Sequence, residues 1–129
     1  MQKELIISII VLIFIFGLNY ITEKNTKDTV QSVTSRLEIV RNDVTQEEVD
    51  KEKATLHTND AFEKWEELDD TLAYYIEHNE IEKVTTALTS VKSYVEMDLY
   101  DDSVEAIDKC IYILDHIKQR EMFTLDNIF

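Results

Sequence analysis

The stretch IEKVTTALTSVKSYV, residues 81–95, decides the fold class. Its apolar side chains recur at spacings of three and four residues, and they are Ile81, Val84, Leu88, Val91 and Val95. This spacing places them on one face of an amphipathic α-helix. The stretch therefore predicts a helix that packs its apolar face against other helices.

The same rhythm continues on both sides of this stretch. Toward the N-terminus, residues 30–44 carry an apolar seam, called here the 30–44 seam, which consists of Val30, Val33, Leu37, Val40 and Val44. Toward the C-terminus, residues 104–117 carry apolar side chains on two sides of a helix. We therefore predict an all-α fold, an antiparallel helical-hairpin bundle of about four to five helices joined by loops of about two to five residues.

Capping boxes predict where the helices begin. In a capping box, the first side chain accepts a hydrogen bond from the third amide, and an acidic side chain reaches back to the first amide. Four pairs have this form: Thr45 with Glu48, Asp60 with Glu63, Asn79 with Glu82, and Asp102 with Glu105. We expect helices to begin at Thr45, Asn79 and Asp102.

The region 45–77 leaves two alternatives open. Its early apolar positions, Val49 and Leu56, lie on a different side of a helix from the later ones. Either the helix breaks near His57 to Asp60, or one long helix changes its packing partner midway.

The N-terminal residues form an almost continuous apolar run from Leu5 to Ile21, called here the N-terminal apolar run. As a helix, these 17 residues cover about 25 Å, and flanking Lys3 and Lys24 can extend that reach toward the ~30 Å of a hydrocarbon core. We predict a single-pass transmembrane helix in residues 1–24, followed by an acidic helical bundle domain in residues 25–129.

A cleaved signal peptide is the alternative to a retained anchor. Cleavage needs small residues just before the cut, and Gly17-Leu18-Asn19 is the one weak match. We therefore expect the N-terminal apolar run to stay attached as a signal anchor at the cell membrane. The flanking charges barely discriminate between the two orientations of the span across the membrane. We expect the helical domain on the extracytoplasmic side.

The composition excludes several functional classes. The 13 Lys and Arg residues against 27 Asp and Glu residues give a net charge of −14, which repels a nucleic-acid backbone. A single Gly excludes nucleotide-binding loops that need several glycines, and a single Cys excludes an internal disulfide or a multi-thiolate metal site. We expect neither a nucleic-acid partner nor a cofactor.

Carboxylates gather around one imidazole in the block Glu77, His78, Asn79 and Glu80. A helical-bundle di-iron site needs Glu three positions before a His, but those positions hold Ala54, Tyr75 and Ile113. Asn is a good N-cap, and the helix dipole favours carboxylates in the first turn. We therefore interpret the block as a helix cap and expect no catalytic, cofactor or metal residues.

The other conspicuous side chains have structural interpretations too. Trp65 is expected to anchor the core, Cys110 to be a small core residue, and His116 to interact with the C-terminal end of its helix. The residues that we single out as partner-facing or structural are Trp65, Glu77, His78, Asn79, Glu80, His116, Asn127, Ile128 and Phe129.

The spacing of several of these residues carries a family resemblance. They are Trp65, the block Glu77-His78-Asn79-Glu80-Ile81, Tyr94, His116-Ile117 and the ending Asn127-Ile128-Phe129. In these features the chain resembles the bacterial domain-of-unknown-function family numbered 4363, short helical proteins with an N-terminal membrane helix, largely from spore-forming Gram-positive bacteria. The resemblance implies the anchor, a bacterial source and the helical fold, but no activity, cofactor or substrate.

These features together favour a non-enzymatic, single-pass membrane protein. Its acidic bundle would be an interaction or accessory module for another membrane protein. The alternative is a structural homo-oligomer that pairs through the 30–44 seam. A third hypothesis is a metal-dependent enzyme built around His78 and its acidic neighbours.

Overall fold

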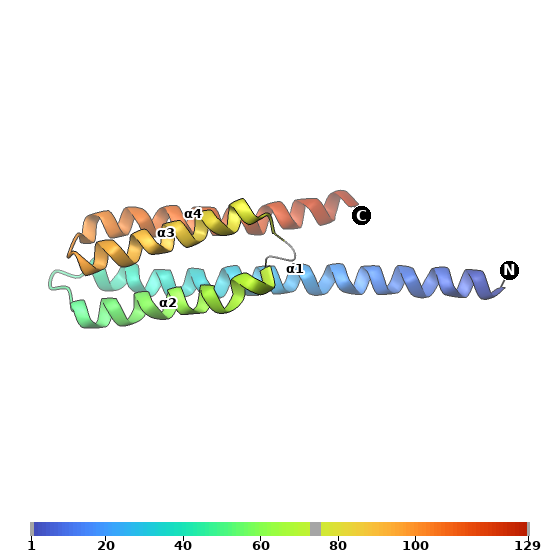
Figure 1. Cartoon of the computed structure of the whole chain (residues 1–129), viewed down its shortest axis with the longest axis horizontal. Helices are drawn as coiled ribbons and strands as arrows, with labels where there is room; N and C mark the ends of the chain where they lie inside the picture. The colour runs from blue at the N-terminus through green and yellow to red at the C-terminus, as the bar shows by residue number, and fades with distance from the viewer. Residues whose placement is uncertain (1, 73–75, 129) are drawn as a thin grey trace.

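Four α-helices and no strand form the part of the chain that the computed structural model describes, which is residues 2–72 and 76–128. Within the helices, the description omits the side chains of residues 19, 22, 23, 25, 69–72 and 121–128. The helices are α1 (Gln2–Val44), α2 (Lys51–Leu72), α3 (His78–Glu96) and α4 (Tyr100–Ile128). Each runs antiparallel to the one before it (Figure 1). The predicted all-α bundle is confirmed.

The four helices form a closed ring of neighbours. Helix α1 packs against α2 and α4, and α3 packs against the same two helices. This is the arrangement of an up-and-down four-helix bundle, in which each helix directs one apolar stripe to the centre. The loop between α1 and α2 and the turn between α3 and α4 lie together at one end, here called the distal end (Figure 1).

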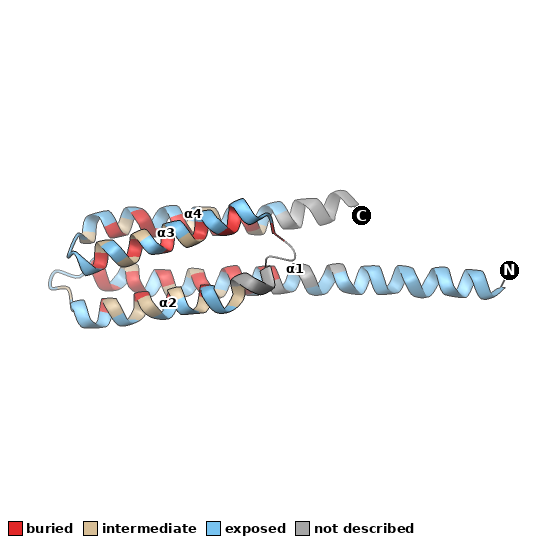
Figure 2. Ribbon diagram, in the orientation of Figure 1, coloured by how far each residue is buried: buried red, intermediate tan, exposed pale blue. Residues whose placement is uncertain are grey.

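The core consists of the apolar stripes that the spacing predicts. The apolar residues at positions 81, 84, 88, 91 and 95 are all buried, and so are all five residues of the 30–44 seam. On α4, Ile107, Cys110, Leu114 and Ile117 face the same centre. Figure 2 shows buried segments recurring along all four helices within the bundle. The 30–44 seam is therefore already covered by the chain's own helices.

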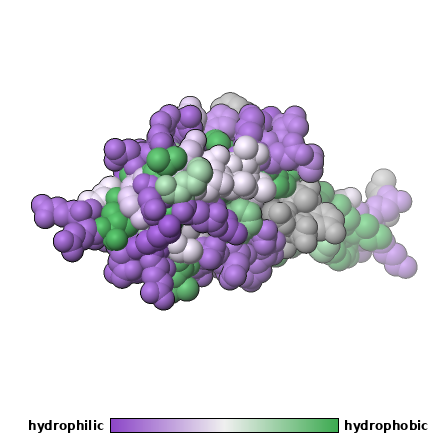
Figure 3. Space-filling view, turned by 60° about the vertical axis from the view of Figure 1, so that its left-hand side comes forward, coloured by the Kyte–Doolittle hydropathy of each residue, from purple (hydrophilic) through white to green (hydrophobic). Residues whose placement is uncertain are grey.

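Helix α1 continues without interruption from the N-terminal apolar run into the bundle. The run extends beyond the other helices (Figure 1), and its described large apolar side chains are 43–67% exposed. In the space-filling view it recedes to the right as a hydrophobic surface, whereas the bundle surface is mostly hydrophilic (Figure 3). Within the described residues, no helix has both the length and the apolar character needed to cross a membrane.

The start of α2 differs from the prediction. The Thr45 hydroxyl donates back to the carbonyls of Arg41 (2.9 Å) and Asn42 (3.2 Å), so Thr45 closes α1. The carboxylate of Asp50 accepts a hydrogen bond of 3.1 Å from the amide of Lys53, which makes Asp50 the cap of α2. The predicted capping box at Thr45 and Glu48 is wrong, because a hydroxyl can serve the helix before it as well as the helix after it.

Helix α2 is continuous through residues 57–60, so the predicted break near His57 to Asp60 is wrong. Thr58 occupies the core position between Ala54 and Ala61, where it is 3% exposed. Its hydroxyl donates to the Ala54 carbonyl at 2.7 Å, which satisfies the buried polar atom. Leu56, by contrast, is 66% exposed. In the sequence, the apolar pattern of α2 changes sides of the helix because Thr58 occupies a core position while Leu56 faces outward.

Helices α3 and α4 begin earlier than the capping boxes predict, whereas α2 begins later. Helix α3 begins at His78, with Glu77 at the N-cap position and no side-chain cap, so Asn79 lies inside the helix. Helix α4 begins at Tyr100, which places Asp102 in its first turn. Both predicted boxes are wrong, because each pair lies within a helix that has already started.

The turn between α3 and α4 explains the early start of α4. The amide of Leu99 donates to the Tyr94 carbonyl at 2.9 Å, and that of Asp98 donates to the Val95 carbonyl at 3.2 Å. These two bonds form a Schellman motif, with Asp98 in the left-handed region at φ 61°. The motif ends α3 and lets α4 begin after three residues.

Candidate functional site

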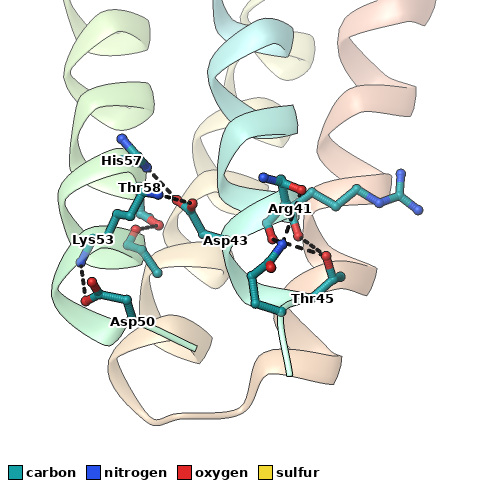
Figure 4. Close-up of polar contacts among 10 residues, drawn as sticks. Arg41, Asp43, Thr45, Asp50, Lys53, His57 and Thr58 are labelled. Atoms are coloured by element: carbon teal, nitrogen blue, oxygen red, sulfur yellow. Dashed lines mark hydrogen bonds and ion pairs between the residues drawn. The ribbon is translucent and has the colours of Figure 1, made fainter. Parts of the chain in front are cut away.

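A buried carboxylate lies near the distal end between α1 and α2. The Asp43 side chain is 5% exposed, and its Oδ2 contacts Nδ1 of His57. Lys53 Nζ lies 3.9 Å from the other carboxylate oxygen of Asp43. In Figure 4, Asp43 points across to α2, where His57 and Lys53 approach it from successive turns of that helix. The cluster joins α1 to α2 through charge-assisted contacts.

Other ion pairs flank the 30–44 seam. Arg36 lies one heptad before Asp43 and contacts Asp60 of α2 at 3.2 Å. On the other side of the seam, Arg41 contacts Asp108 of α4 at 2.9 Å. Arg41 extends away from the Asp43 cluster in Figure 4. These pairs match α1 with α2 on one side and with α4 on the other, so they favour one register of the bundle.

The Asp43 cluster is suited to structure more than to catalysis. A His and Asp pair acts in acid–base chemistry when it activates a nucleophile within hydrogen-bond reach. The nearby Thr58 hydroxyl is buried and already donates to Ala54. Because a buried carboxylate is costly without partners, we interpret His57 and Lys53 as the groups that compensate Asp43.

A second cluster ties the distal loops together. Lys51 Nζ lies 3.0 Å from Asp98 Oδ1 and donates to the Glu96 carbonyl at 3.0 Å. The Tyr100 hydroxyl donates to the same Asp98 oxygen at 3.0 Å. The hydrogen bonds from Lys51 and then from Tyr100 lower the pKa of Asp98, whereas desolvation and the bond to Asp98 raise the pKa of Tyr100.

The predicted block at residues 77–80 meets α4 at the opposite end of the bundle. Arg120 Nη2 donates to Glu77 Oε1 at 3.0 Å, and Arg120 Nη1 lies 3.6 Å from Glu80 Oε1. Glu80 is 8% exposed and is also 3.5 Å from Lys83 Nζ. The structure therefore brings Glu77 and Glu80 together with Arg120, which is the partner that the sequence interpretation missed.

His78 and Asn79 lie away from this contact. The side chain of His78 is 81% exposed, and its Nε2 is 2.9 Å from Glu82 one turn later. Asn79 is exposed too. A contact between two exposed side chains one helical turn apart contributes little, so this part of the block stabilises α3 only locally.

Trp65 is a core residue, as predicted. It is 0% exposed, and its indole nitrogen donates to the Thr85 hydroxyl of α3 at 2.9 Å. The hydroxyl of Thr85 in turn donates to the Ile81 carbonyl at 3.1 Å. The indole thus combines apolar burial with a satisfied polar group.

The prediction for His116 is wrong. Helix α4 runs to Ile128, so the exposed His116 lies in its middle and not near its C-terminal dipole. Asn127 and Ile128 belong to the last turn of α4, but their side chains fall outside the described part, and Phe129 lies outside the described residues.

Cys110 is buried in the core, and burial raises the pKa of its thiol to about 12. A thiol that stays protonated is a poor nucleophile, which agrees with the predicted core role. Among the described side chains, no group of three His, Cys, Asp or Glu converges to hold a metal ion.

Comparison with known proteins gives one family assignment. No curated protein and no solved structure matches the chain. A family model described as "Domain of unknown function (DUF4363)" matches residues 20–128, which include all of α2, α3 and α4. The chain therefore belongs to this family.

Proposed function

We propose that the protein is a non-enzymatic, membrane-anchored interaction module. Its N-terminal apolar run lies in the lipid of the cell membrane as a single span. The acidic bundle is held on the extracytoplasmic side, where it contacts another membrane protein. The bacterial setting and the membrane anchor are part of this proposal.

The exposure of the N-terminal apolar run carries the proposal. From Leu5 to Ile15 the large apolar side chains are at least 43% exposed, on all sides of the helix. A helix that is apolar all round is stable where lipid or protein covers it. Roughly thirteen strongly apolar residues favour insertion by about 4 to 8 kcal/mol on the insertion scale.

The continuity of α1 supports the proposed role in presenting the bundle. The same helix supplies the N-terminal apolar run and the 30–44 seam, without a break between them. A continuous helix transmits position and orientation better than a flexible linker. The bundle would thus be held at a defined distance from the membrane.

The state of the reactive side chains supports a non-enzymatic role. His57 is held by Asp43, His78 is paired with Glu82, and the Cys110 thiol is buried. The homo-oligomer alternative has a specific cost: the 30–44 seam is covered by α2 and α4, so pairing through it requires the bundle to open.

A flotation experiment tests the proposed anchor. The full chain is mixed with phosphatidylcholine vesicles and centrifuged through a density gradient. The double variant Ile9→Asp, Ile13→Asp places charges in the N-terminal apolar run, where each costs about 2.5–3.5 kcal/mol in a bilayer. The matched control Ile39→Asp, Leu56→Asp changes exposed apolar residues of the bundle, which are 46% and 66% exposed.

We expect the unchanged chain and the control to float and the Ile9, Ile13 variant to remain in the dense fraction. Flotation of all three proteins alike would contradict the anchor. The orientation is tested by adding protease to intact cells stripped of outer layers. Digestion of residues 28–129 supports the extracytoplasmic side, and resistance contradicts it.

A further inference from the structure

Three adjoining hollows follow the outward face of α3 and α4. One of about 120 Å³ lies between the two helices, and the others, of about 570 Å³ and 550 Å³, open over α4 and toward the start of α3. All three share Lys109, so they form one continuous surface, called here the α3–α4 groove. Its central residues are Ala87, Ser90 and Tyr94 of α3 with Glu105, Lys109 and Ile113 of α4.

Small side chains open this groove. Ala87 and Ser90 face Ala106 across the line where the two helices meet. Larger apolar side chains rise beside them on α4, where Val104 and Ile113 are half-buried and Tyr112 is 74% exposed. An exposed aromatic beside a shallow apolar channel is typical of a surface that receives a partner side chain or helix.

The rim of the groove is acidic. Five carboxylates line the three hollows against two lysines: Glu82, Asp101, Asp102, Glu105 and Asp108, with Lys83 and Lys109. Lys109 is itself paired with Glu105 at 3.3 Å, and Asp108 is paired with Arg41 of α1 at 2.9 Å, so the carboxylates still outnumber these cations. The charge of the rim therefore favours a basic occupant.

We propose that the α3–α4 groove binds an amphipathic helix of a partner protein, with an apolar stripe flanked by Lys and Arg. The apolar stripe would lie on Ala87, Tyr112 and Ile113, and the basic residues would face the rim. This names the surface and the partner class for the interaction module, and it rests on that proposed function. A second copy fits poorly, because two acidic rims on chains of net charge −14 would face each other.

The probe is an 18-residue peptide of Leu and Lys, with Leu at helical spacings of three and four. It is titrated into the full chain in dodecyl maltoside micelles, and binding is followed by NMR chemical shifts. Two control peptides accompany it: one has the same composition in a non-amphipathic order, and the other replaces Lys with Glu. Peptide partition into the micelle is the same for every protein variant, so differences between variants report the protein surface.

We expect saturable shifts in residues 87–94 and 104–113. Tyr112→Ser should weaken binding at least tenfold, because it removes the most exposed apolar side chain of the groove. The matched control Leu56→Ser, on α2 and 66% exposed, should leave binding unchanged. Both substitutions lie on the surface, and thermal unfolding checks that both proteins remain folded.

Equal binding to Tyr112→Ser, shifts confined to other helices, or equal binding of the reordered peptide would overturn the groove proposal. A concentration-dependent dimer in sedimentation, lost in Tyr112→Ser, would make a second copy the occupant and contradict the partner helix. Flotation is measured separately. A chain that floats but binds no peptide contradicts the groove alone, and a chain that binds peptide but does not float contradicts the anchor alone.

Discussion

The indole nitrogen of Trp65 on α2 donates a hydrogen bond of 2.9 Å to the hydroxyl of Thr85 on α3. These helices are successive in the chain, and the loop that joins them contains residues 73–75, which lie outside the description. Trp65 and Thr85 link the first hairpin (α1 and α2) to the second (α3 and α4) through a hydrogen bond whose donor side chain is fully buried. Substitutions can separate the contribution of the buried Trp65 ring from that of its hydrogen bond to Thr85.

Trp65→Ala should lower the free energy of unfolding by about 3–5 kcal/mol, because it removes a fully buried large side chain. Thr85→Val keeps the shape but leaves the indole N–H without its acceptor, and should cost about 1–3 kcal/mol. Urea unfolding of the full chain, followed by circular dichroism in neutral micelles, measures both. A loss below about 1 kcal/mol for Trp65→Ala would contradict its place in the core.

The buried carboxylate of Asp43 provides a second prediction. In His57→Ala, the remaining described partner of the Asp43 carboxylate is Lys53 at 3.9 Å. This change should lower the free energy of unfolding by about 1–3 kcal/mol. The double variant Asp43→Ala, His57→Ala should cost less than the sum of the two single changes, because the uncompensated charge is gone. Urea unfolding monitored by Trp65 fluorescence gives the double-mutant cycle.

His78→Ala is the matched control for that cycle. Its side chain is 81% exposed, so the change should stay within about 0.5 kcal/mol. Strictly additive losses at Asp43 and His57 would show that the two residues do not interact.

The corrected helix starts give a third prediction. Asp50→Ala should cost about 0.5–2 kcal/mol, since Asp50 caps α2 through the Lys53 amide, whereas Asn79→Ala should stay within about 0.5 kcal/mol. Thermal unfolding of the two variants side by side distinguishes them. The reverse order of losses would restore Asn79 as a cap and contradict the observed start of α3.

The fourth prediction concerns alkaline pH. The pKa of Cys110 rises from 9.0 to about 12 on folding. The contribution of the protonated thiol to the free energy of unfolding is therefore complete below pH 9, and it declines as the pH rises toward 12. A rise of about three pKa units corresponds to an upper bound of about 4 kcal/mol. Cys110→Ala should be less stable at pH 7 but should lose less stability between pH 9 and pH 11 than the unchanged chain.

Urea unfolding at a series of pH values tests this difference, in which the titration of Tyr and Lys side chains cancels. Parallel pH curves for the two proteins would contradict the burial of the thiol. Reaction of the native thiol with a soluble thiol reagent at pH 8 should likewise be slow.

Much of the fold is encoded in apolar spacing. The 30–44 seam and the stripe from Ile81 to Val95 are buried as the sequence predicts. The helix starts are harder, because a Thr hydroxyl can donate to the carbonyls that end one helix or accept from the amides that begin the next. Thr45 closes α1 while Asp50 opens α2, and only the path of the chain decides between these roles.

The polar contacts between helices could not be predicted from local patterns. Arg120 meets Glu77 from a distance of 43 residues in sequence, and His57 meets Asp43 across a loop. One signal was available: Arg36 and Asp43 stand seven residues apart beside the 30–44 seam, the spacing of residues that flank a helix interface. The groove between α3 and α4 depends on how small residues from two helices align, which sequence spacing does not specify.

The intact mass of the protein in native membranes washed with alkaline carbonate tests whether the N-terminal apolar run holds the mature protein in a membrane. We predict a membrane-bound chain whose mass includes residues 1–24. A mature protein that lacks the N-terminal apolar run, or one released into the wash, would contradict the claim.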